Sequence, residues 1–294
     1  MLTLRQLEIF LAVARREHVT AAARDVHLSQ SAVSTALREL QTTLGGPLFE
    51  KDGRRIRLND RGRHLVEEAS DLVQRAQDLV QHFAGDEAIA GKLRLGASST
   101  IGTYLLPALV GAFVAAHADV QVDLEVGNSA EVARRLLAHE LDAGFVEGPV
   151  HLPQLVATPW RKDRLVVFVT PDDPLARRRR LAPAALRTLR FVMRESGSGT
   201  REVFETALRA HGVAPTPHLT FGHSEAVKQA VRGGLGVGCL SELTVRRELD
   251  AGEFVAVKVA GLALERTLWR IARRGAYASR LLRACFDALR GELE

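Results

Sequence analysis

The sequence predicts an α/β protein in three parts: a helical N-terminal module that ends in a β-hairpin, a long linking helix, and a C-terminal region of alternating strands and helices. Three patterns support this division. Apolar residues recur at helical spacing over residues 1–44, they follow a heptad spacing over residues 65–83, and short β-rich runs alternate with helical ones from residue 92. A chain of 294 residues is long enough for two or three domains with cores of their own.

Three helices are expected in the N-terminal module. The first has one buried face, made of Leu4, Leu7, Leu11 and Ala14. Thr20 is expected to cap a second, short helix over residues 21–26, because a hydroxyl can accept a hydrogen bond from a free amide at a helix start. His27 then takes the left-handed conformation of a tight turn, and Ser29 caps the third helix.

The third helix has one apolar and one polar face. Val33, Leu37, Leu40 and Leu44 form the core stripe. The opposite face carries Gln30, Ser31, Ser34, Thr35, Arg38 and Gln41. Short or flexible hydrogen-bonding side chains suit base edges and phosphates in a DNA major groove, so the first five of these are candidate DNA contacts. Taken alone, the same face also fits a solvated helix surface.

A short β-hairpin follows the third helix. Gly45, Gly46 and Pro47 end the helix, and the basic turn over residues 51–55 joins two short strands. This arrangement is a winged helix-turn-helix, in which Lys51, Arg54 and Arg55 are candidate phosphate or minor-groove contacts. Residues 1–63 hold eleven Lys and Arg against seven Asp and Glu, a net charge of +4 out of +5 for the whole chain. Such an excess favours a polyanionic partner.

The segment over residues 29–62, SQSAVSTALRELQTTLGGPLFEKDGRRIRLNDRG, resembles the DNA-binding module of LysR-type transcriptional regulators, and the match runs from Leu4 to Gly62. The resemblance implies a transcription regulator that binds double-stranded DNA. The family commonly has Pro where this chain has Ser31 and Arg where it has Thr35. Ser34 and Arg38 match the family better and are the stronger candidates for base contacts.

Residues 60–91 are predicted to form a linking helix, capped by Asp60, and a hinge over residues 85–91. Its heptad seam consists of Leu65, Ala69, Leu72, Ala76, Leu79 and Phe83, beside a second row of Val66, Val73 and Val80. The resemblance implies a homodimer through this helix, and further a homotetramer and a contact with RNA polymerase. The alternative is an amphipathic helix that packs only within its own monomer.

The C-terminal region is predicted to be α/β with a largely parallel sheet. Strands are expected over residues 92–97, 120–126, 143–148, 164–170, 190–195 and 236–240, and helices over residues 105–117, 130–139, 201–211 and 225–232. The resemblance implies a two-lobed, periplasmic-binding-protein-like (type II) effector-binding domain. The predicted domains are residues 1–59, 60–91 and 92–294, with lobe 1 over 92–162 and 268–294 and lobe 2 over 163–267.

Two junctions between a strand and a helix carry small polar residues. The candidate effector ligands there are Ser98, Ser99 and Thr100 after one strand, and Ser196, Ser198, Thr200 and Arg201 after another. Free amides at a helix start, hydroxyls and an arginine suit a small anion, although each junction alone also fits ordinary helix capping. His223, Ser224 and Glu147 are second-rank candidates. Glu147 would repel an anion unless it bonds a protonated ligand oxygen or a cationic neighbour, and a polar contact between lobes is its alternative role.

Within the family, the segments GSGTR and VGNSAEVARRLLAHELDAGFVEGPV resemble the branch that includes regulators of sulfur assimilation and sulfite response. The resemblance therefore implies a small anionic metabolite or inorganic oxyanion as effector, with sulfite as the leading choice. No cofactor is expected beside this effector.

Other functions find less support in the sequence. Cys239 and Cys285 lie in apolar surroundings typical of a core, and no metal-type histidine pairing, no GxSxG motif and no phosphate loop occurs, so we expect neither an enzyme nor a metal site. A solute-binding protein would share the C-terminal fold but would require export. The N-terminus does not resemble a signal peptide and no apolar run is long enough to span a membrane, which favours a cytoplasmic protein. The arginine run over residues 177–180 fits a solvated loop better than a second nucleic-acid site.

Overall fold

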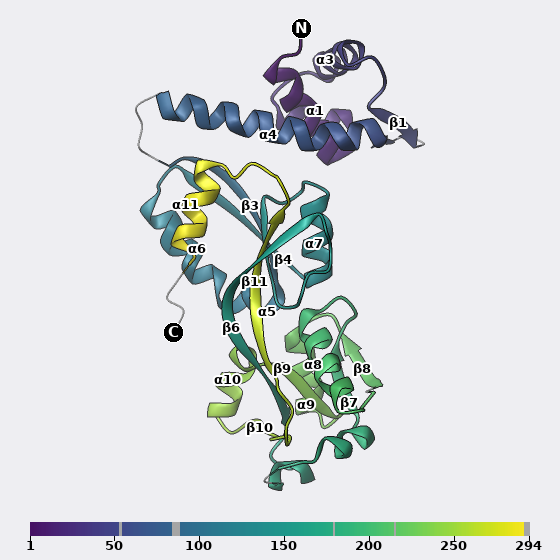
Figure 1. The fold of residues 1–294 in the computed structure, drawn as a ribbon, viewed down its shortest axis with the longest axis vertical. Helices are drawn as coiled ribbons and strands as arrows, with labels where there is room; N and C mark the ends of the chain where they lie inside the picture. Colours follow the sequence, from purple (N-terminus) through teal and green to yellow (C-terminus); the bar gives the residue numbers. More distant parts are fainter. Residues whose placement is uncertain (53–54, 84–88, 179, 215, 291–294) are drawn as a thin grey trace. The chain divides into compact units, whose positions relative to one another are not determined.

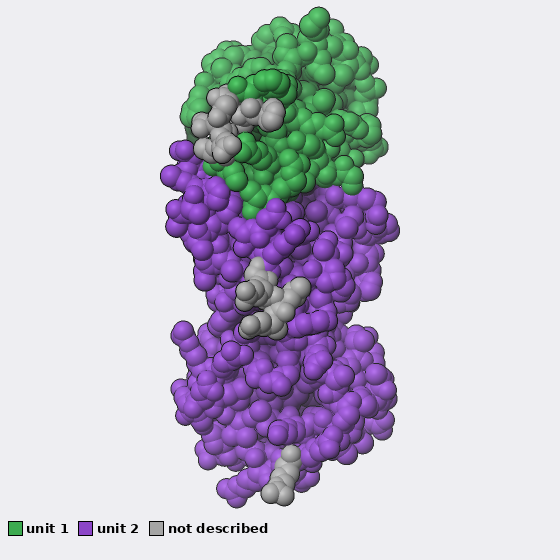
Figure 2. Space-filling model, turned by 60° about the vertical axis from the view of Figure 1, so that its left-hand side comes forward, with its two compact units in different colours: residues 1–90, 275–284 green, residues 91–274, 285–294 purple. Residues whose placement is uncertain are grey.

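A computed structural model describes residues 1–52, 55–83, 89–178, 180–214 and 216–290. These residues form two compact units, which Figure 2 shows in different colours. Unit 1 comprises residues 1–90 and 275–284, and unit 2 comprises residues 91–274 and 285–294. Arg54 and the side chains of Lys51 and Arg55 lie outside the described residues.

Unit 1 begins with three helices packed around one core. They are α1 (Leu4–Arg16), α2 (Val19–Asp25) and α3 (Gln30–Thr43). Phe10, Val33 and Leu40 are fully buried, and Leu7 and Leu37 nearly so, as the helical spacing predicted. Leu4, which was expected in the same stripe, is exposed because it occupies the first turn of α1, at the edge of the module.

The turns of this module follow the sequence in part. His27 has the expected left-handed backbone, with φ of 55°, and the Ser29 Oγ accepts a hydrogen bond from the Ala32 amide at 3.1 Å. The cap of α2 differs from the expectation. Helix α2 begins one residue before Thr20, and the His18 Nδ1 accepts from the Ala21 amide at 3.3 Å.

The hairpin consists of β1 (Phe49–Asp52) and β2 (Arg55–Leu58), which pair antiparallel. Helix α4 (Asp60–Phe83) follows at once. Its start is capped by Asn59, not by Asp60, since the Asn59 Oδ1 accepts from the Gly62 amide at 2.9 Å. Gly62 permits a close approach here, because a Cβ at this position would lie 2.1 Å from the Leu48 carbonyl oxygen.

The apolar stripe of α4 divides into two parts. Val66, Ala69 and Val73 are buried in the core that α1–α3 form. Leu72, Leu79, Val80 and Phe83 are exposed. The second part is therefore available to a partner, while the first fixes α4 to the three-helix module of its own chain.

Residues 275–284 pack with unit 1, although the predicted domains placed them in lobe 1. The Tyr277 hydroxyl donates to Asp78 Oδ2 on α4 at 2.8 Å, and the Arg280 amide donates to the same oxygen at 2.8 Å. The Arg75 guanidinium also lies 5.0 Å from the Tyr277 ring centroid. These contacts join residues about 200 positions apart in the chain, which periodicity does not reveal.

Unit 2 is built on a sheet with the strand order β4-β3-β5-β11-β6-β9-β7-β8 (Figure 1). In chain order the strands are β3 (Gly91–Ser98), β4 (Val120–Gly127), β5 (Ala143–Val146), β6 (Leu155–Val169), β7 (Phe191–Arg194), β8 (Pro217–Phe221), β9 (Val237–Ser241), β10 (Val255–Ala256) and β11 (Glu265–Arg273). Strands β3–β5 are parallel in one lobe, and β7–β9 are parallel in the other. The expected parallel order thus holds within each lobe.

Two crossing strands join the lobes. Both β6 and β11 pass from one lobe into the other and pair antiparallel with each other (Figure 1). The first part of β6 pairs with β11 alone, and its last residues pair with β9 and β10. Strands β8, β10 and β11 were not among the predicted runs, because each is short or carries charged residues.

The helices of unit 2 connect these strands. They are α5 (Ser99–Tyr104), α6 (Leu106–Ala116), α7 (Ser129–Leu137), α8 (Gly199–Ala210), α9 (Ser224–Arg232), α10 (Glu242–Asp250) and the last part of α11 (Arg280–Ala288), with the 3₁₀ helices η1 (Pro174–Arg177) and η2 (Pro183–Thr188). Helices α5, α8 and α9 begin where β3, β7 and β8 end, or within a few residues of that point. Their first turns therefore meet at the boundary of the two lobes, which is where open α/β sheets bind ligands.

Candidate DNA-binding face and effector site

The polar face of α3 is open to a partner. Gln30, Ser31, Thr35 and Arg38 are exposed, and Ser34 is half-buried. This face lies opposite the buried stripe of Val33, Leu37 and Leu40, so the helix can rest on the core and still present the polar residues to DNA.

Arg38 is held loosely on this face. Its Nη2 donates to the Thr35 Oγ1 at 3.2 Å, and its Nε donates to the Ser34 carbonyl at 3.4 Å. Both distances are long for hydrogen bonds from a guanidinium, so little is lost when the side chain extends toward a base.

At the lobe boundary, a buried carboxylate collects several of the predicted effector residues. Glu147, just after β5, accepts a hydrogen bond from the Thr100 amide at 2.6 Å and from the Thr200 hydroxyl at 2.6 Å. Its Oε2 also lies 3.1 Å from Nη1 of Arg266 on β11. Thr100 belongs to lobe 1 and Thr200 to lobe 2, so Glu147 ties the first turns of α5 and α8 together.

The protonation state of Glu147 follows from these contacts. Burial alone would raise the pKa of this carboxyl, but the Arg266 charge and the hydrogen bonds from Thr200 and Thr100 together hold the pKa below its ordinary value. The group is therefore ionised at neutral pH. Its carboxylate accepts from an amide in the first turn of α5 and has the cationic neighbour Arg266, one of the two conditions that the sequence analysis set for a carboxylate here.

Arg266 connects Glu147 to a second carboxylate. Its Nε donates to Asp163 Oδ2 on β6 at 2.7 Å, and the Ser241 hydroxyl donates to Asp163 Oδ1 at 2.9 Å. Arg266 and the side chains of both acids are almost completely buried. Sequence reasoning missed Arg266 and Asp163. The sign that could have indicated them is that each is a charged residue inside a strand, Asp163 in β6 and Arg266 in β11.

A second buried arginine, Arg194, lies at the end of β7. It is 2% exposed. Its Nη2 donates to the Ser99 hydroxyl in lobe 1 at 3.1 Å, and its Nη1 donates to the Ser224 hydroxyl in lobe 2 at 3.0 Å. A guanidinium that reaches both lobes at strand ends is suited to a small anion. Sequence reasoning found the two serines but read Arg194 only as part of a strand.

The other predicted ligands lie beside this cluster or apart from it. Arg201 pairs with Glu205 at 2.7 Å on its own helix and donates to the Arg194 carbonyl at 3.4 Å. Ser196 and His223 are exposed, and Ser198 is buried without a side-chain hydrogen bond to the start of α8. Ser98 is buried next to Ser99 at the end of β3 and is one of the groups that lower the pKa of Glu147. The cluster therefore consists of Ser98, Ser99, Thr100, Glu147, Arg194, Thr200, Ser224 and Arg266.

The lobes also contact each other through their backbones beside this cluster. The Ala130 amide in lobe 1 donates to the Gly197 carbonyl in lobe 2 at 3.2 Å. A Cβ on Gly199 would lie 2.5 Å from the Gly148 nitrogen and 2.8 Å from the Glu147 carbonyl carbon. Only a glycine fits at the first residue of α8 while the lobes keep this spacing.

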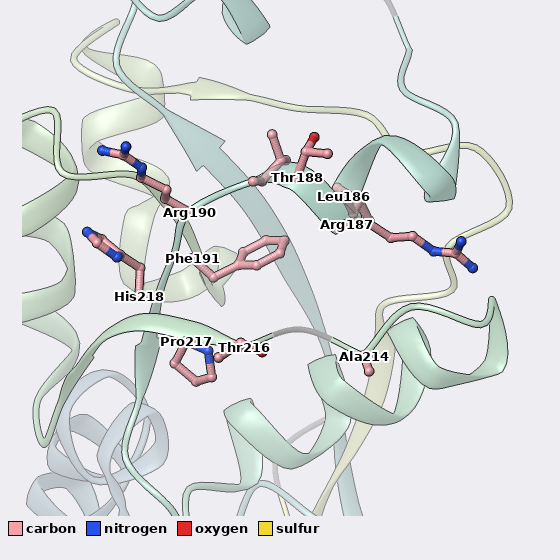
Figure 3. A pocket seen from close by; sticks show the side chains of 10 residues that line it. Leu186, Arg187, Thr188, Arg190, Phe191, Ala214, Thr216, Pro217 and His218 are labelled. Carbon is pink, nitrogen blue, oxygen red and sulfur yellow. The ribbon is translucent and has the colours of Figure 1, made fainter.

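A separate hollow of about 290 Å³ lies at the opposite ends of β7 and β8, lined by Leu186, Arg187, Thr188, Leu189, Arg190, Phe191, Ala214, Thr216, Pro217 and His218. Figure 3 shows the Phe191 ring between η2 and the start of β8, with the Arg187 side chain turned away from it. The cationic residues that line this hollow are exposed.

No group of the described residues has the His, Cys, Asp and Glu clustering of a metal site. No described helix meets the length and hydropathy needed to cross a bilayer.

A winged helix-turn-helix, a long helix and a two-lobed α/β domain together define a DNA-binding transcription regulator with an effector domain. Residues 4–63 match the model for the bacterial regulatory helix-turn-helix protein of the lysR family, and residues 86–294 match the LysR substrate binding domain. The chain belongs to the LysR family of transcriptional regulators, and it is not an enzyme.

Relatives support this assignment over nearly the whole chain. The HTH-type transcriptional regulator YeiE of Escherichia coli is 41% identical, over 97% of this chain and 96% of YeiE, in agreement with the branch that the residue pattern indicated. A full-length OxyR variant from Pseudomonas aeruginosa shares the fold at a TM-score of 0.79 and 23% identity, over 99% of this chain and 95% of that one. The Synechocystis CcmR regulatory domain in complex with 2-PG is 30% identical, with a TM-score of 0.63, over 68% of this chain and 96% of that one.

Proposed function

We propose that this regulator binds operator DNA as a homodimer through α3 and the β1–β2 hairpin, and that a small anion at the lobe boundary changes this binding. The observation that carries the effector part is the buried Arg194, which contacts Ser99 of one lobe and Ser224 of the other. An anion bound there would touch both lobes and would favour the arrangement in which both contacts are made. A ligand shifts such an equilibrium only by its difference in affinity for the two arrangements.

Sulfite is the first effector to test, on the family resemblance and because its oxygens fit a guanidinium flanked by hydroxyls. The related CcmR regulatory domain was solved in complex with 2-PG, and this supports a small ligand in the same domain here.

We further propose that dimers pair into a homotetramer and contact RNA polymerase. A dimer would place two recognition helices on DNA at multiples of one helical turn.

The experiment selects genomic DNA fragments with the purified full-length protein and measures footprint, bend angle and affinity with and without sodium sulfite. We expect sulfite to change at least one of the three on selected fragments. Sulfate serves as a control for ionic strength. An unchanged footprint, bend and affinity across sulfite, sulfate and phosphate would reject the anionic effector, whereas failure to select any fragment would reject the DNA-binding proposal.

Replacing Arg38 with Ala should weaken binding to a selected fragment by about 1–3 kcal/mol, the range for a guanidinium that reads a base edge. The reason is the exposed, loosely held Arg38 side chain on the polar face of α3. Fluorescence anisotropy on the selected fragment and on a scrambled one measures the effect. Lys51→Ala provides the comparison, because a phosphate contact is lost equally on both DNAs. Equal losses for Arg38→Ala would make Arg38 a phosphate contact.

Replacing Leu79 with Glu should raise the dimer dissociation constant by at least about tenfold, which corresponds to about 1.4 kcal/mol. Leu79 is 58% exposed on α4 and lies in the part of the stripe that unit 1 does not cover. Burying a carboxylate in place of an apolar side chain at a helix seam is unfavourable. Sedimentation equilibrium measures the change. Gln77→Glu adds the same charge at an exposed polar position of α4, and an equal effect of both variants would argue against the α4 dimer.

A further inference from the structure

We infer that the Glu195 carboxylate is an internal anion that occupies Arg194 in the ligand-free protein, and that an anionic effector enters the site by replacing it. This inference rests on the proposed function, since it concerns the same site, and it identifies what the effector competes with. It assigns the exchange to a residue that no motif in the sequence marks.

The geometry of the pair is that of a bound carboxylate ligand. Arg194 Nε donates to Glu195 Oε2 at 2.7 Å, and Nη2 donates to Oε1 at 2.9 Å. Two parallel bonds of this kind are the preferred way in which a guanidinium holds a carboxylate or another oxyanion. Neighbouring side chains on a strand point to opposite faces, so this pairing requires the strand to end between them. Strand β7 does end at Arg194.

The two partners differ sharply in burial. The Arg194 side chain is 2% exposed and that of Glu195 is 23% exposed. A buried cation needs a counter-charge, whereas a carboxylate at the rim regains its hydration when it turns outward. Glu195 is therefore the partner that can be exchanged, and a free anion with two oxygens on one atom can take its place without leaving Arg194 unpaired.

The remaining partners of Arg194 stay in position during such an exchange. Its guanidinium also donates to the Ser99 hydroxyl, the Ser224 hydroxyl and the Gly222 carbonyl, all of which are neutral. Ser224 accepts from Arg194 and keeps a hydroxyl proton with which to donate to a ligand oxygen. The site thus offers a cation and a hydroxyl donor to one anionic group.

Glu147 is the contrasting case. Its side chain is 2% exposed and is held by Arg266, Thr200 and the Thr100 amide. A buried carboxylate with these partners would lose its counter-charge and its hydrogen bonds by turning outward, so it stays in place while Glu195 is exchanged.

Competition by Glu195 lowers the apparent affinity for the effector. When only a fraction of molecules has Arg194 free, the apparent dissociation constant rises by the inverse of that fraction. If Glu195 leaves Arg194 free in about one molecule in ten, its removal tightens binding about tenfold. Tighter effector binding after loss of the charge identifies a competing carboxylate, because neutralising a residue that binds the ligand would weaken binding instead.

The test is calorimetric titration of the full-length protein with sodium sulfite. Glu195→Gln keeps the shape of the side chain and removes its charge, and we expect its dissociation constant to be about tenfold lower than that of the natural protein. Glu205→Gln is the control, since Glu205 also pairs with arginines of lobe 2, at 2.7 Å to both Arg201 and Arg209. Arg201 contacts Arg194 at its carbonyl oxygen, at 3.4 Å, and not at its guanidinium. Equal or weaker binding by Glu195→Gln would overturn the inference while leaving the proposed function intact.

A second measurement does not depend on the effector's identity. Glu195→Ala leaves Arg194 without its carboxylate, and added sodium acetate should restore the melting temperature of this variant more than it raises that of the natural protein or of Glu205→Ala. If sulfite binds to none of the proteins but acetate rescues Glu195→Ala, the exchange stands and sulfite is not the effector. If acetate raises all three melting temperatures equally, the exchange is refuted.

Discussion

Replacing Arg266 with Met is expected to lower the free energy of unfolding of unit 2 by about 3–5 kcal/mol at neutral pH, the range for breaking a buried ion pair from one side. Arg266 lies between Glu147, at 3.1 Å, and Asp163, at 2.6 Å, and each of the three side chains is 2% exposed, so water hardly reaches them. Met preserves the length of the side chain but leaves two buried carboxylates without a counter-charge. Urea unfolding followed by near-UV circular dichroism measures the loss.

Arg270→Met on the same strand is the matched control. Arg270 stacks on Phe286, with its guanidinium carbon 4.0 Å from the ring centroid. Its loss should cost only about 0.5–2 kcal/mol, the range for a cation over an aromatic ring. The double variant Arg266→Met with Glu147→Gln should recover part of the loss, because the pair is coupled. Similar urea midpoints for Arg266→Met and Arg270→Met would contradict the role of the buried network.

The effect of Arg266→Met should also depend on pH in a definite direction. In the natural protein the pKa of Glu147 is held below its ordinary value, so its contribution to stability is complete above the ordinary pKa and is lost as the pH falls through the lowered one. Without Arg266, burial raises the pKa of Glu147 and acid neutralises the carboxyl. The difference in stability between the two proteins should therefore shrink as the pH falls from neutral into the acid range.

The sequence predicted the fold well where the periodicity was strong. Val33, Leu37 and Leu40 are buried on α3 as their spacing required, and most predicted strands and helices of unit 2 occur within a few residues of their expected bounds. The crossing strands β6 and β11 were harder, because alternation on their surfaces is interrupted by the charged Asp163 and Arg266. Their charges are satisfied only by residues distant in sequence.

The sequence indicated which small polar residues meet at the lobe boundary but not the charged groups between them. Ser99, Thr100, Thr200 and Ser224 were expected at strand ends, and they contact Glu147 or Arg194 there. Their role as effector ligands stays a prediction. Which of them face a free ligand depends on how the protein's own charges are distributed. Glu147 already satisfies Thr100 and Thr200, so Arg194 is the centre at which we propose the exchange. A local pattern cannot show that a carboxylate from another strand occupies an expected ligand position.

Replacing Gly199 with Ala is the second change with a large expected effect, because it acts on the spacing of the lobes. The new Cβ would lie 2.5 Å from the Gly148 nitrogen, 2.8 Å from the Glu147 carbonyl carbon and 2.9 Å from the Ser129 Oγ. Two of these atoms are backbone, so the start of α8 must move. The adjacent Thr200 then gives up its 2.6 Å hydrogen bond to Glu147.

Overpacking of this kind costs about 1–3 kcal/mol, and a lost hydrogen bond to a charged group costs about 1.5–3 kcal/mol, so we expect Gly199→Ala to destabilise unit 2 by about 2.5–6 kcal/mol. Urea unfolding measures the loss, and the same preparation should lose the response of DNA binding to sulfite. Gly111→Ala in α6 is the control, and it should raise the free energy of unfolding. No atom lies within 4 Å of the Cβ position of Gly111, and Ala favours the helix more than Gly does. Should Gly199→Ala unfold at the urea concentration of the natural protein, the close approach at Gly148 would not be what sets the spacing of the two lobes.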